Sequence, residues 1–372
     1  MSNMRINIFN PEWASSEKEM FFSLLNNKNI PSEEEFQEYV KVNKKLYFSS
    51  CGKSSLYAIL KSNNIGKGDE VIIPWYCCEA AAYPIRYLHA KPVLADIDVS
   101  DLNISVDSVL KLISPKTKAI IVPSMYGNPA NIIEIKEKIG KNALIINDMA
   151  QAYGCTLNNT PIECFGDAGF LSCGPGKQLT GAGGSLFWSN NNNICTLKNQ
   201  NIPVNKIFHK LFYYTRVDID KNIKSPFYKI ALNFYRALNQ HVFRVNKSAT
   251  PLDINVMLML MENYPSKLEG KRIFIADVEK LSENKTYRLI KNQRGTGSPL
   301  KIVLLFNSAK ACNSAKRILD GGKIYYSTGY EKLKGVEKTV LRGCNQILGK
   351  IIEIPLEVRK KECILDVLKK ID

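Results

Sequence analysis

Long apolar runs are missing from this sequence of 372 residues. No uninterrupted apolar stretch approaches the roughly 18 residues that a membrane-spanning helix needs. The first five residues, Met1 to Arg5, also lack the apolar core of a secretory signal. We therefore expect a cytoplasmic protein with no stable membrane insertion.

Metal-binding patterns are missing as well. The chain has only three histidines, His89, His209 and His241, and they are not clustered. Its ten cysteines include the adjacent pair Cys77-Cys78 but no Cys-x-x-Cys pair, and they lack the dense spacing of a disulfide-rich secreted domain. We expect reduced thiols and no zinc or iron site.

Acidic residues are outnumbered, with 35 Asp and Glu against 51 Lys and Arg and a net charge of +16. An excess of this size can indicate nucleic-acid binding. Much of it lies between about 197 and 250, however, and no RNA-binding or helix-turn-helix pattern accompanies it. Because phosphorylated small molecules also need cations, we expect no nucleic-acid partner.

Strand-like and helical patterns alternate between about 47 and 190. The expected strands lie at 70–73, 92–97, 119–123 and 143–148, and the expected helices at 54–63, 79–89 and 132–139. Apolar strands separated by helices predict an α/β fold, with a mostly parallel mixed sheet flanked by helices on both faces. Ligands of such sheets bind at the carboxyl ends of the strands.

The second half of the chain has a different pattern. From 191 to about 290 it reads as aromatic and basic helices, and the run from Met257 to Met261 is rich in methionine. These helices could pack on the sheet or on a partner subunit, or form an amphipathic membrane-surface helix. The expected elements beyond 300 are strands at 300–306, 323–326 and 347–354 and helices at 309–319 and 358–370.

These patterns predict three parts. Residues 1–46 form an N-terminal segment that packs on the large domain, which spans 47–250. Residues 251–372 form interdomain helices and a small C-terminal α+β domain.

Two charged residues are expected at the carboxyl edge of the large sheet. The apolar strand ending at Asp148 is followed three residues later by Gln151. A second strand breaks into the glycine-rich loop Ser172 to Gly176, which presents Lys177. An amine in a tight loop is poorly placed for solvation and well placed for covalent chemistry.

Six motifs between about 47 and 190 carry a family resemblance. They are Cys51–Leu56, Gly66–Pro74, Asp96–Asp98, Tyr126–Pro129, Asp148–Ala152 and Ser172–Lys177. In order and spacing they resemble the DegT/DnrJ/EryC1/StrS family of fold type I, pyridoxal 5'-phosphate (PLP)-dependent aminotransferases, which act on nucleotide-linked keto-sugars. The resemblance implies PLP as cofactor, an amino-acid donor expected to be glutamate, and a homodimer with sites built across the interface. It also implies a place in surface polysaccharide or glycoside biosynthesis.

The resemblance implies a role for each residue of the site. Lys177 would bind the cofactor covalently and move protons. Asp148 would keep the ring nitrogen protonated, because a nearby negative charge favours the charged ring. Gln151 matches the position that contacts the ring near its phenolic oxygen.

The cofactor phosphate needs backbone donors at a helix start. Gly52, Lys53 and Ser54 open the helix expected there, and Ser172 matches a phosphate-binding hydroxyl. Lys53 stands where the family usually has threonine, and its side chain could bind phosphate or point to solvent.

Cys78 occupies the position of the aromatic residue that stacks on the cofactor ring. Ring stacking is therefore weakened, or Trp75 or Tyr76 takes it over; the sequence leaves this open.

Other readings of the glycine-rich segments are less consistent. A phosphate-loop nucleotide hydrolase would need glycine at Leu171 and serine or threonine at Gln178. A dinucleotide-binding oxidoreductase would need glycines where Pro74-Trp75-Tyr76 stands. Two alternatives stay open: a sugar dehydratase, which in this family carries histidine in place of the lysine, and a non-catalytic scaffolding or regulatory protein.

Overall fold

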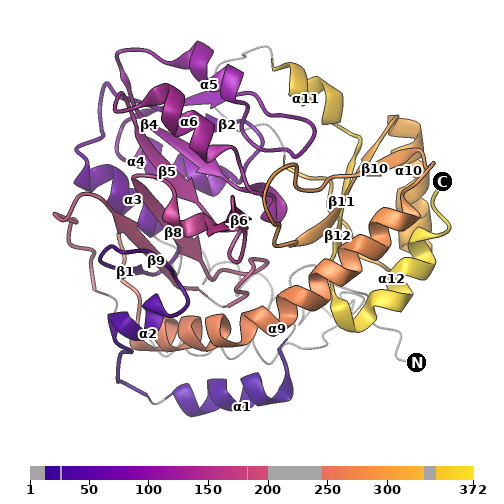
Figure 1. Cartoon of the computed structure of the whole chain (residues 1–372), viewed down its shortest axis with the longest axis horizontal. Coiled ribbons are helices and arrows are strands. Elements are labelled where there is room, and N and C mark those ends of the chain that lie inside the picture. Colours follow the sequence, from indigo (N-terminus) through magenta and orange to yellow (C-terminus); the bar gives the residue numbers. More distant parts are fainter. Residues whose placement is uncertain (1–12, 26, 182, 200–244, 331–340) are drawn as a thin grey trace, which may run out of the picture.

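The structure, a computed structural model, describes residues 13–25, 27–181, 183–199, 245–330 and 341–372 (Figure 1). A seven-stranded sheet in the order β1-β9-β8-β5-β4-β2-β3 forms the larger part. Its strands are β1 (Tyr47–Ser49), β2 (Glu70–Pro74), β3 (Lys91–Ala95), β4 (Thr117–Pro123), β5 (Leu144–Asp148), β8 (Ala168–Ser172) and β9 (Ser185–Ser189). Strands β3, β2, β4, β5 and β8 are parallel, and β9 runs antiparallel to both of its neighbours. The predicted mostly parallel mixed sheet is confirmed.

Alternate residues of the central strands enter two different cores. In β5, Ile145 belongs to the cluster on one face and Ile146 to the cluster on the other. Strand β4 divides in the same way, with Ile120 on the first face and Ile121 on the second. Successive side chains of a strand point to opposite faces, so continuous apolar strands require cover on both sides.

Helices provide this cover. Buried residues of α3 (Gly52–Ser62) and α4 (Ala82–Tyr87) join one cluster, and those of α5 (Val106–Leu112) and α6 (Ile132–Ile139) join the other. The helix expected at 79–89 is divided into a 3-10 turn, η1 (Glu79–Ala81), and α4. Helix α5 was not predicted; its N-cap is Ser105, whose hydroxyl accepts from Ser108 N.

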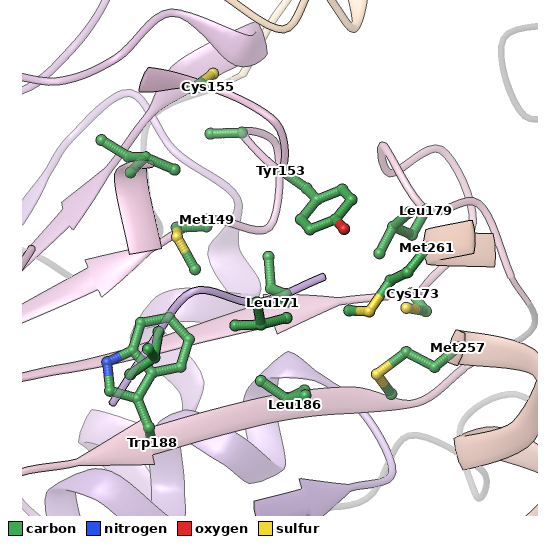
Figure 2. Packing of buried hydrophobic residues seen from close by; sticks show 14 of the residues in the cluster. Met149, Tyr153, Cys155, Leu171, Cys173, Leu179, Leu186, Trp188, Met257 and Met261 are labelled. Atoms are coloured by element: carbon green, nitrogen blue, oxygen red, sulfur yellow. The ribbon is translucent and has the colours of Figure 1, made fainter. Parts of the chain in front are cut away.

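The long helix α9 (Pro251–Leu281) runs beneath the large sheet toward the small one, with α1 (Ser15–Leu24) and α2 (Glu33–Gln37) near its N-terminal half (Figure 1). Its methionine-rich run packs on the sheet: Met257 and Met261 are fully buried and lie close to side chains of β8, β9 and the loop between them (Figure 2). For this run, packing against the sheet is observed. Residues 200–244, which carry the other expected aromatic and basic helices, lie outside the described residues.

The small sheet is antiparallel and contains β10 (Tyr287–Leu289), β11 (Lys301–Phe306) and β12 (Ile351–Pro355). Helices α10 (Ala309–Gly321) and α12 (Lys361–Leu368) pack with it and with the C-terminal half of α9 around a third cluster. The shorter elements are η2 (Met125–Gly127), β6 (Thr156–Leu157), β7 (Thr160–Pro161), η3 (Ile162–Cys164), α11 (Arg342–Ile347) and η4 (Val358–Lys360).

Three expectations for this region need correction. Residues 323–326 do not form a strand: Lys323 has a positive φ of 55°, and the stretch makes only isolated bridges at Ile324 and at Ser327, which pairs with Glu353. The strand expected to begin at 347 begins at Ile351, because 342–347 form α11 and Gly349 turns the chain with a φ of 73°. The helix expected at 358–370 is α12, preceded by the 3-10 turn η4.

None of the helices in the described ranges is long and apolar enough to cross a membrane.

Replacing Met257 by alanine should lower the free energy of unfolding by about 2–5 kcal/mol, because the change leaves a cavity between α9 and the sheet. The matched control is Met20→Ala in α1, where the side chain is 40% exposed and the loss should be within about 0.5 kcal/mol. Urea unfolding followed by circular dichroism measures both. Equal losses in the two variants would contradict the packing of α9 described here.

Candidate active site

The carboxyl ends of β4, β5 and β8 lie at one edge of the large sheet. Asp148, the last residue of β5, is in register with Pro123 of β4 and Phe170 of β8. The segments that follow these strands, together with the start of α3, line a pocket of about 860 Å³ that is open to solvent. The pocket therefore lies where the strand-end rule predicts a ligand.

The predicted site residues converge on this pocket. Those that line it are Gly52, Lys53, Cys78, Asp148, Gln151, Ser172 and Lys177. Ser54 does not line it: its side chain is buried, with the hydroxyl 3.1 Å from Ser50 Oγ and accepting from Lys247 N at 3.3 Å. The Ser54 hydroxyl is thus bonded to these two neighbours, which lie outside the lining of the pocket.

Asp148 is the acid of the pocket. Its Oδ1 accepts the Ala150 N–H at 3.0 Å, and it forms no ion pair with any described residue. Burial raises the pKa of Asp148 above its ordinary value, while Lys177 and the Ala150 N–H act in the opposite direction. The carboxylate is thus short of positive charge on the side that faces the pocket.

Lys177 is held in a loop fastened at both ends. Cys173 N donates to Gly184 O at 2.9 Å, and Gly181 N donates back to Cys173 O at 3.0 Å. Within the loop, Lys177 N donates to Gly174 O at 3.3 Å, and the Thr180 hydroxyl donates to Lys177 O. The Lys177 amine and Asp148 are close enough to interact electrostatically without forming an ion pair.

The N-terminus of α3 opens at the pocket. Its N-cap, Cys51, makes no capping hydrogen bond with its side chain, and the first turn contains no acidic residue. Gly52 lies against β8, because a Cβ at this position would be 3.1 Å from the Phe170 ring and 3.4 Å from Ser172 Cβ. A helix start with unpaired amides and no competing acid favours an anion.

Gln151 has both ends of its carboxamide bound. Tyr126 N donates to Oε1 at 3.0 Å, and Nε2 donates to the Tyr330 hydroxyl at 2.8 Å. Tyr330 belongs to the C-terminal part of the chain and was not predicted.

Neither aromatic candidate for ring stacking lines the pocket. Trp75 is buried and donates to Asp96 at 3.0 Å, and the buried Tyr76 hydroxyl lies 2.9 Å from that of Tyr126. Cys77 and Cys78 of this segment do line the pocket; Cys77 is buried, and Cys78 is exposed. The Lys53 amine lies 5.6 Å from the ring centroid of Tyr83.

A second pocket of about 690 Å³ is also lined by residues of the Lys177 loop. Four lysines line it, namely Lys177, Lys267, Lys271 and Lys301. Lys267 pairs with Glu17 at 2.5 Å and Lys301 with Glu353 at 2.6 Å. This pocket could not be predicted from the sequence, because α9, β11 and the N-terminal segment are far apart in the chain and meet only in the folded structure.

Several other residues that line the first pocket were not predicted from the sequence, although the positions of some of them relative to the strands would have identified them. Ser124 and Met125 line it and directly follow β4, so the strand-end rule alone could have identified them. Phe170 and Leu56 line it from the sheet and α3, and nothing in their local sequence separates them from core residues.

The donor set fits PLP. A carboxylate without a cationic partner suits the ring nitrogen, an uncapped helix N-terminus suits the phosphate, and a loop lysine suits the aldehyde. The three features come from different elements, α3, β5 and the loop after β8, and they border one cavity.

Several known proteins are similar to this chain in sequence or in fold. The sequence profile of the DegT/DnrJ/EryC1/StrS aminotransferase family matches residues 15–209. A GDP-perosamine synthase of Vibrio cholerae is 32% identical over 188 residues, which cover 49% of this chain and 51% of that protein. A GDP-4-keto-6-deoxy-D-mannose 3-dehydratase of Escherichia coli O55:H7 is 33% identical over 113 residues, 30% of this chain and 29% of that protein.

Among solved structures, a putative sugar aminotransferase, Spr1654 from Streptococcus pneumoniae, superimposes with a TM-score of 0.75 at 19% identity, covering 99% of this chain and 98% of that one. This likeness extends the shared fold beyond the family profile. The chain spans about half the length of the Vibrio protein in sequence. Since the profile matches more than half of its residues, the chain belongs to the DegT/DnrJ/EryC1/StrS aminotransferase family.

Proposed function

We propose that this protein is a PLP-dependent aminotransferase that moves an amino group from an amino acid to a nucleotide-linked keto-sugar. One observation carries the proposal: Lys177 and Asp148 face the same pocket, which also opens to the N-terminus of α3. Its family membership and the names of its relatives support the same chemistry.

PLP, when bound, supplies an aldehyde that takes up an amine and a ring that accepts electrons. Lys177 Nζ would hold the group covalently and, when free, would carry a proton within the pocket. The Asp148 carboxylate would hold the proton of the ring nitrogen, because the opposite charge favours the protonated ring.

The remaining residues would bind and orient. The backbone amides of Gly52 and Lys53 and the Ser172 hydroxyl would hold the phosphate at the start of α3. Gln151 would contact the phenolic oxygen. Cys78 would border the ring in place of an aromatic residue, so the ring face would be only weakly stacked.

The substrate proposal is a nucleoside diphosphate hexose with a keto carbon, and glutamate as amine donor. Because Lys177 also lines the second pocket, a sugar bound there would border the same amine. We propose basic residues between 198 and 247, among them Lys206, Lys210 and Arg216, for the diphosphate; these three lie outside the described residues. We place the reaction in surface polysaccharide or glycoside biosynthesis in the cytoplasm.

The dehydratase alternative is less well supported. One relative is named as a 3-dehydratase, but the expected replacement of lysine by histidine is missing here. Lys177 at this position favours transamination.

Lys177→Ala should abolish the visible absorbance that wild-type protein acquires with PLP and that borohydride removes. Transamination with glutamate should fall by about 10²- to 10⁴-fold or more, because both the covalent anchor and the proton carrier are lost. The exposed Lys67→Ala serves as control and should keep both properties. A colourless wild-type protein that ignores added PLP would favour the scaffold alternative.

Asp148→Asn should stabilise the apoprotein at pH 7. Burial raises the pKa of Asp148, so the folded protein holds the Asp148 proton more tightly than the unfolded chain does. This contribution to the free energy of unfolding is fully present below the unfolded pKa of about 3.9, and it is lost as pH rises through the folded pKa. The advantage of the asparagine variant in thermal unfolding should therefore shrink as pH falls.

With PLP bound the order should reverse, because only the carboxylate pairs with a protonated ring nitrogen. Thermal shifts of the two proteins, with and without PLP, measure both effects. An asparagine variant that gains as much stability from PLP as wild type would show that Asp148 is not the ring partner.

We also propose a homodimer, from the family resemblance. One chain has a mass of 41.9 kDa, and light scattering should give twice that value. A mass equal to one chain would contradict it.

A further inference from the structure

Three tyrosines from distant parts of the chain meet beside the active-site pocket. Tyr76 follows β2, Tyr126 follows β4, and Tyr330 lies in the segment between α10 and α11. The ring centroids of Tyr76 and Tyr330 are 5.4 Å apart, and those of Tyr126 and Tyr330 are 6.4 Å apart. The cluster joins the edge of the large sheet to the C-terminal part of the chain.

A buried carboxylate determines the direction of its hydrogen bonds. Glu353 of β12 is 3% exposed and accepts from Lys301 Nζ and Ser327 Oγ, each at 2.6 Å. The Tyr126 hydroxyl also donates to Glu353. Its proton is therefore committed, and Tyr126 can only accept from Tyr76, 2.9 Å away.

Tyr76 in turn positions the backbone of Tyr330. Its proton goes to Tyr126, and its oxygen lies against the backbone at Gly329 and Tyr330. Burial raises the pKa of all three tyrosines, so each hydroxyl keeps its proton at neutral pH. The approach is close: a Cβ on Gly329, whose φ is 80°, would lie 2.3 Å from the Tyr76 hydroxyl.

Tyr126 determines which end of the Gln151 carboxamide is the oxygen, and Tyr330 holds the other end. The Tyr126 N–H is only a donor, so the atom facing it at 3.0 Å must be Oε1. The other end of the carboxamide is Nε2, which donates one N–H to the Tyr330 oxygen at 2.8 Å. Its second N–H is left for the pocket that Gln151 lines.

We propose that Tyr330 is a positioning residue, which holds Gln151 so that its side chain presents a hydrogen-bond donor, and not an acceptor, to the cofactor. The inference rests on the proposed function, in which Gln151 contacts the phenolic oxygen of PLP. It makes the segment after α10 and the small sheet part of the cofactor site.

The expected consequence is electrostatic. Loss of the chromophore's proton leaves more negative charge on the phenolic oxygen, so a donor at Gln151 stabilises the deprotonated form and lowers the pH midpoint of the visible band. Freeing the carboxamide weakens this donor. The midpoint should then rise.

The test is a spectral pH titration of the PLP-loaded protein. Tyr330→Phe should raise the midpoint by about half to one pH unit, and Gln151→Ala should raise it at least as far. In the double variant, the tyrosine change should add nothing, because its effect passes through Gln151. The matched control is Tyr287→Phe in β10, whose buried hydroxyl has no hydrogen-bond partner in the described structure.

Several results would overturn the role of Tyr330. One is an unchanged midpoint in Tyr330→Phe, and another is an equal rise when the same change is made in the Gln151→Ala background. A rise of the same size in the Tyr287→Phe control would also count against it.

Gly329→Ala provides a second variant, because its Cβ would displace Tyr330 from Tyr76 while the Tyr330 side chain is retained. The pH midpoint should rise in this variant too. An unchanged midpoint would contradict the proposal. A wild-type protein that develops no visible band with PLP would instead remove the proposed function, and this inference with it.

Discussion

The burial of one carboxylate is the constraint on which the site depends. Asp148 ends a strand whose preceding residues, Ile145 and Ile146, are fully buried in the two cores of the sheet. Ionising a carboxyl group there is unfavourable, and its raised pKa reflects that cost. One backbone amide and the field of Lys177 offset it only in part. A cavity that keeps such an acid at its wall is complementary to a positive group, which is what a protonated pyridine supplies.

The sheet topology supplies the opposing amine. Strands β4, β5 and β8 are parallel and end in register, but β9 returns antiparallel beside β8. The connection between β8 and β9 must therefore fold back over the carboxyl edge, and hydrogen bonds between Cys173 and residues 181 and 184 close it into a tight loop. Lys177 is thus fixed above the same edge that carries Asp148, with little freedom for the backbone between them.

Local rules explain why much of this site could be predicted from sequence. Asp148 and Lys177 each follow an apolar strand, and Gly52 precedes an amphipathic helix, so pattern and strand-end geometry suffice to bring them together. The contacts of the Ser54 hydroxyl could not be predicted in this way, because one of its partners, Lys247, lies 193 positions away in the sequence. The absence of a strand at 323–326 has a similar cause: Ile324 fills the small core, while the backbone there makes isolated bridges and no ladder.

The contact of Tyr330 with Gln151 could not be predicted from the sequence. Tyr330 lies 179 positions from Gln151, and their contact exists only because the C-terminal segment docks on the large sheet. In the sequence, only the preceding Gly329 separates Tyr330 from the tyrosines at 325 and 326, and a lone glycine does not identify a site residue. The distinction comes from Gly329, whose backbone conformation lets the chain approach Tyr76.

The Gln151 carboxamide joins the segment after β4 to the segment after α10 through its two ends. Oε1 is bound to a backbone amide at the end of β4, whereas Nε2 is bound to a hydroxyl brought by the C-terminal half. Glu353 fastens that half by accepting from a lysine, a serine and Tyr126, and a buried carboxylate with three donors is costly to separate from them. Hydrogen bonds weaken over small changes in distance and angle, so the position of Nε2 depends on how the small sheet is docked. The family profile covers residues 15–209, which include every predicted site residue, yet the donor that Gln151 offers to the pocket is set by residues beyond that range. The chemistry of the site is therefore a property of both halves of the chain, and substitutions at the contact between the sheets act on the cofactor without touching it.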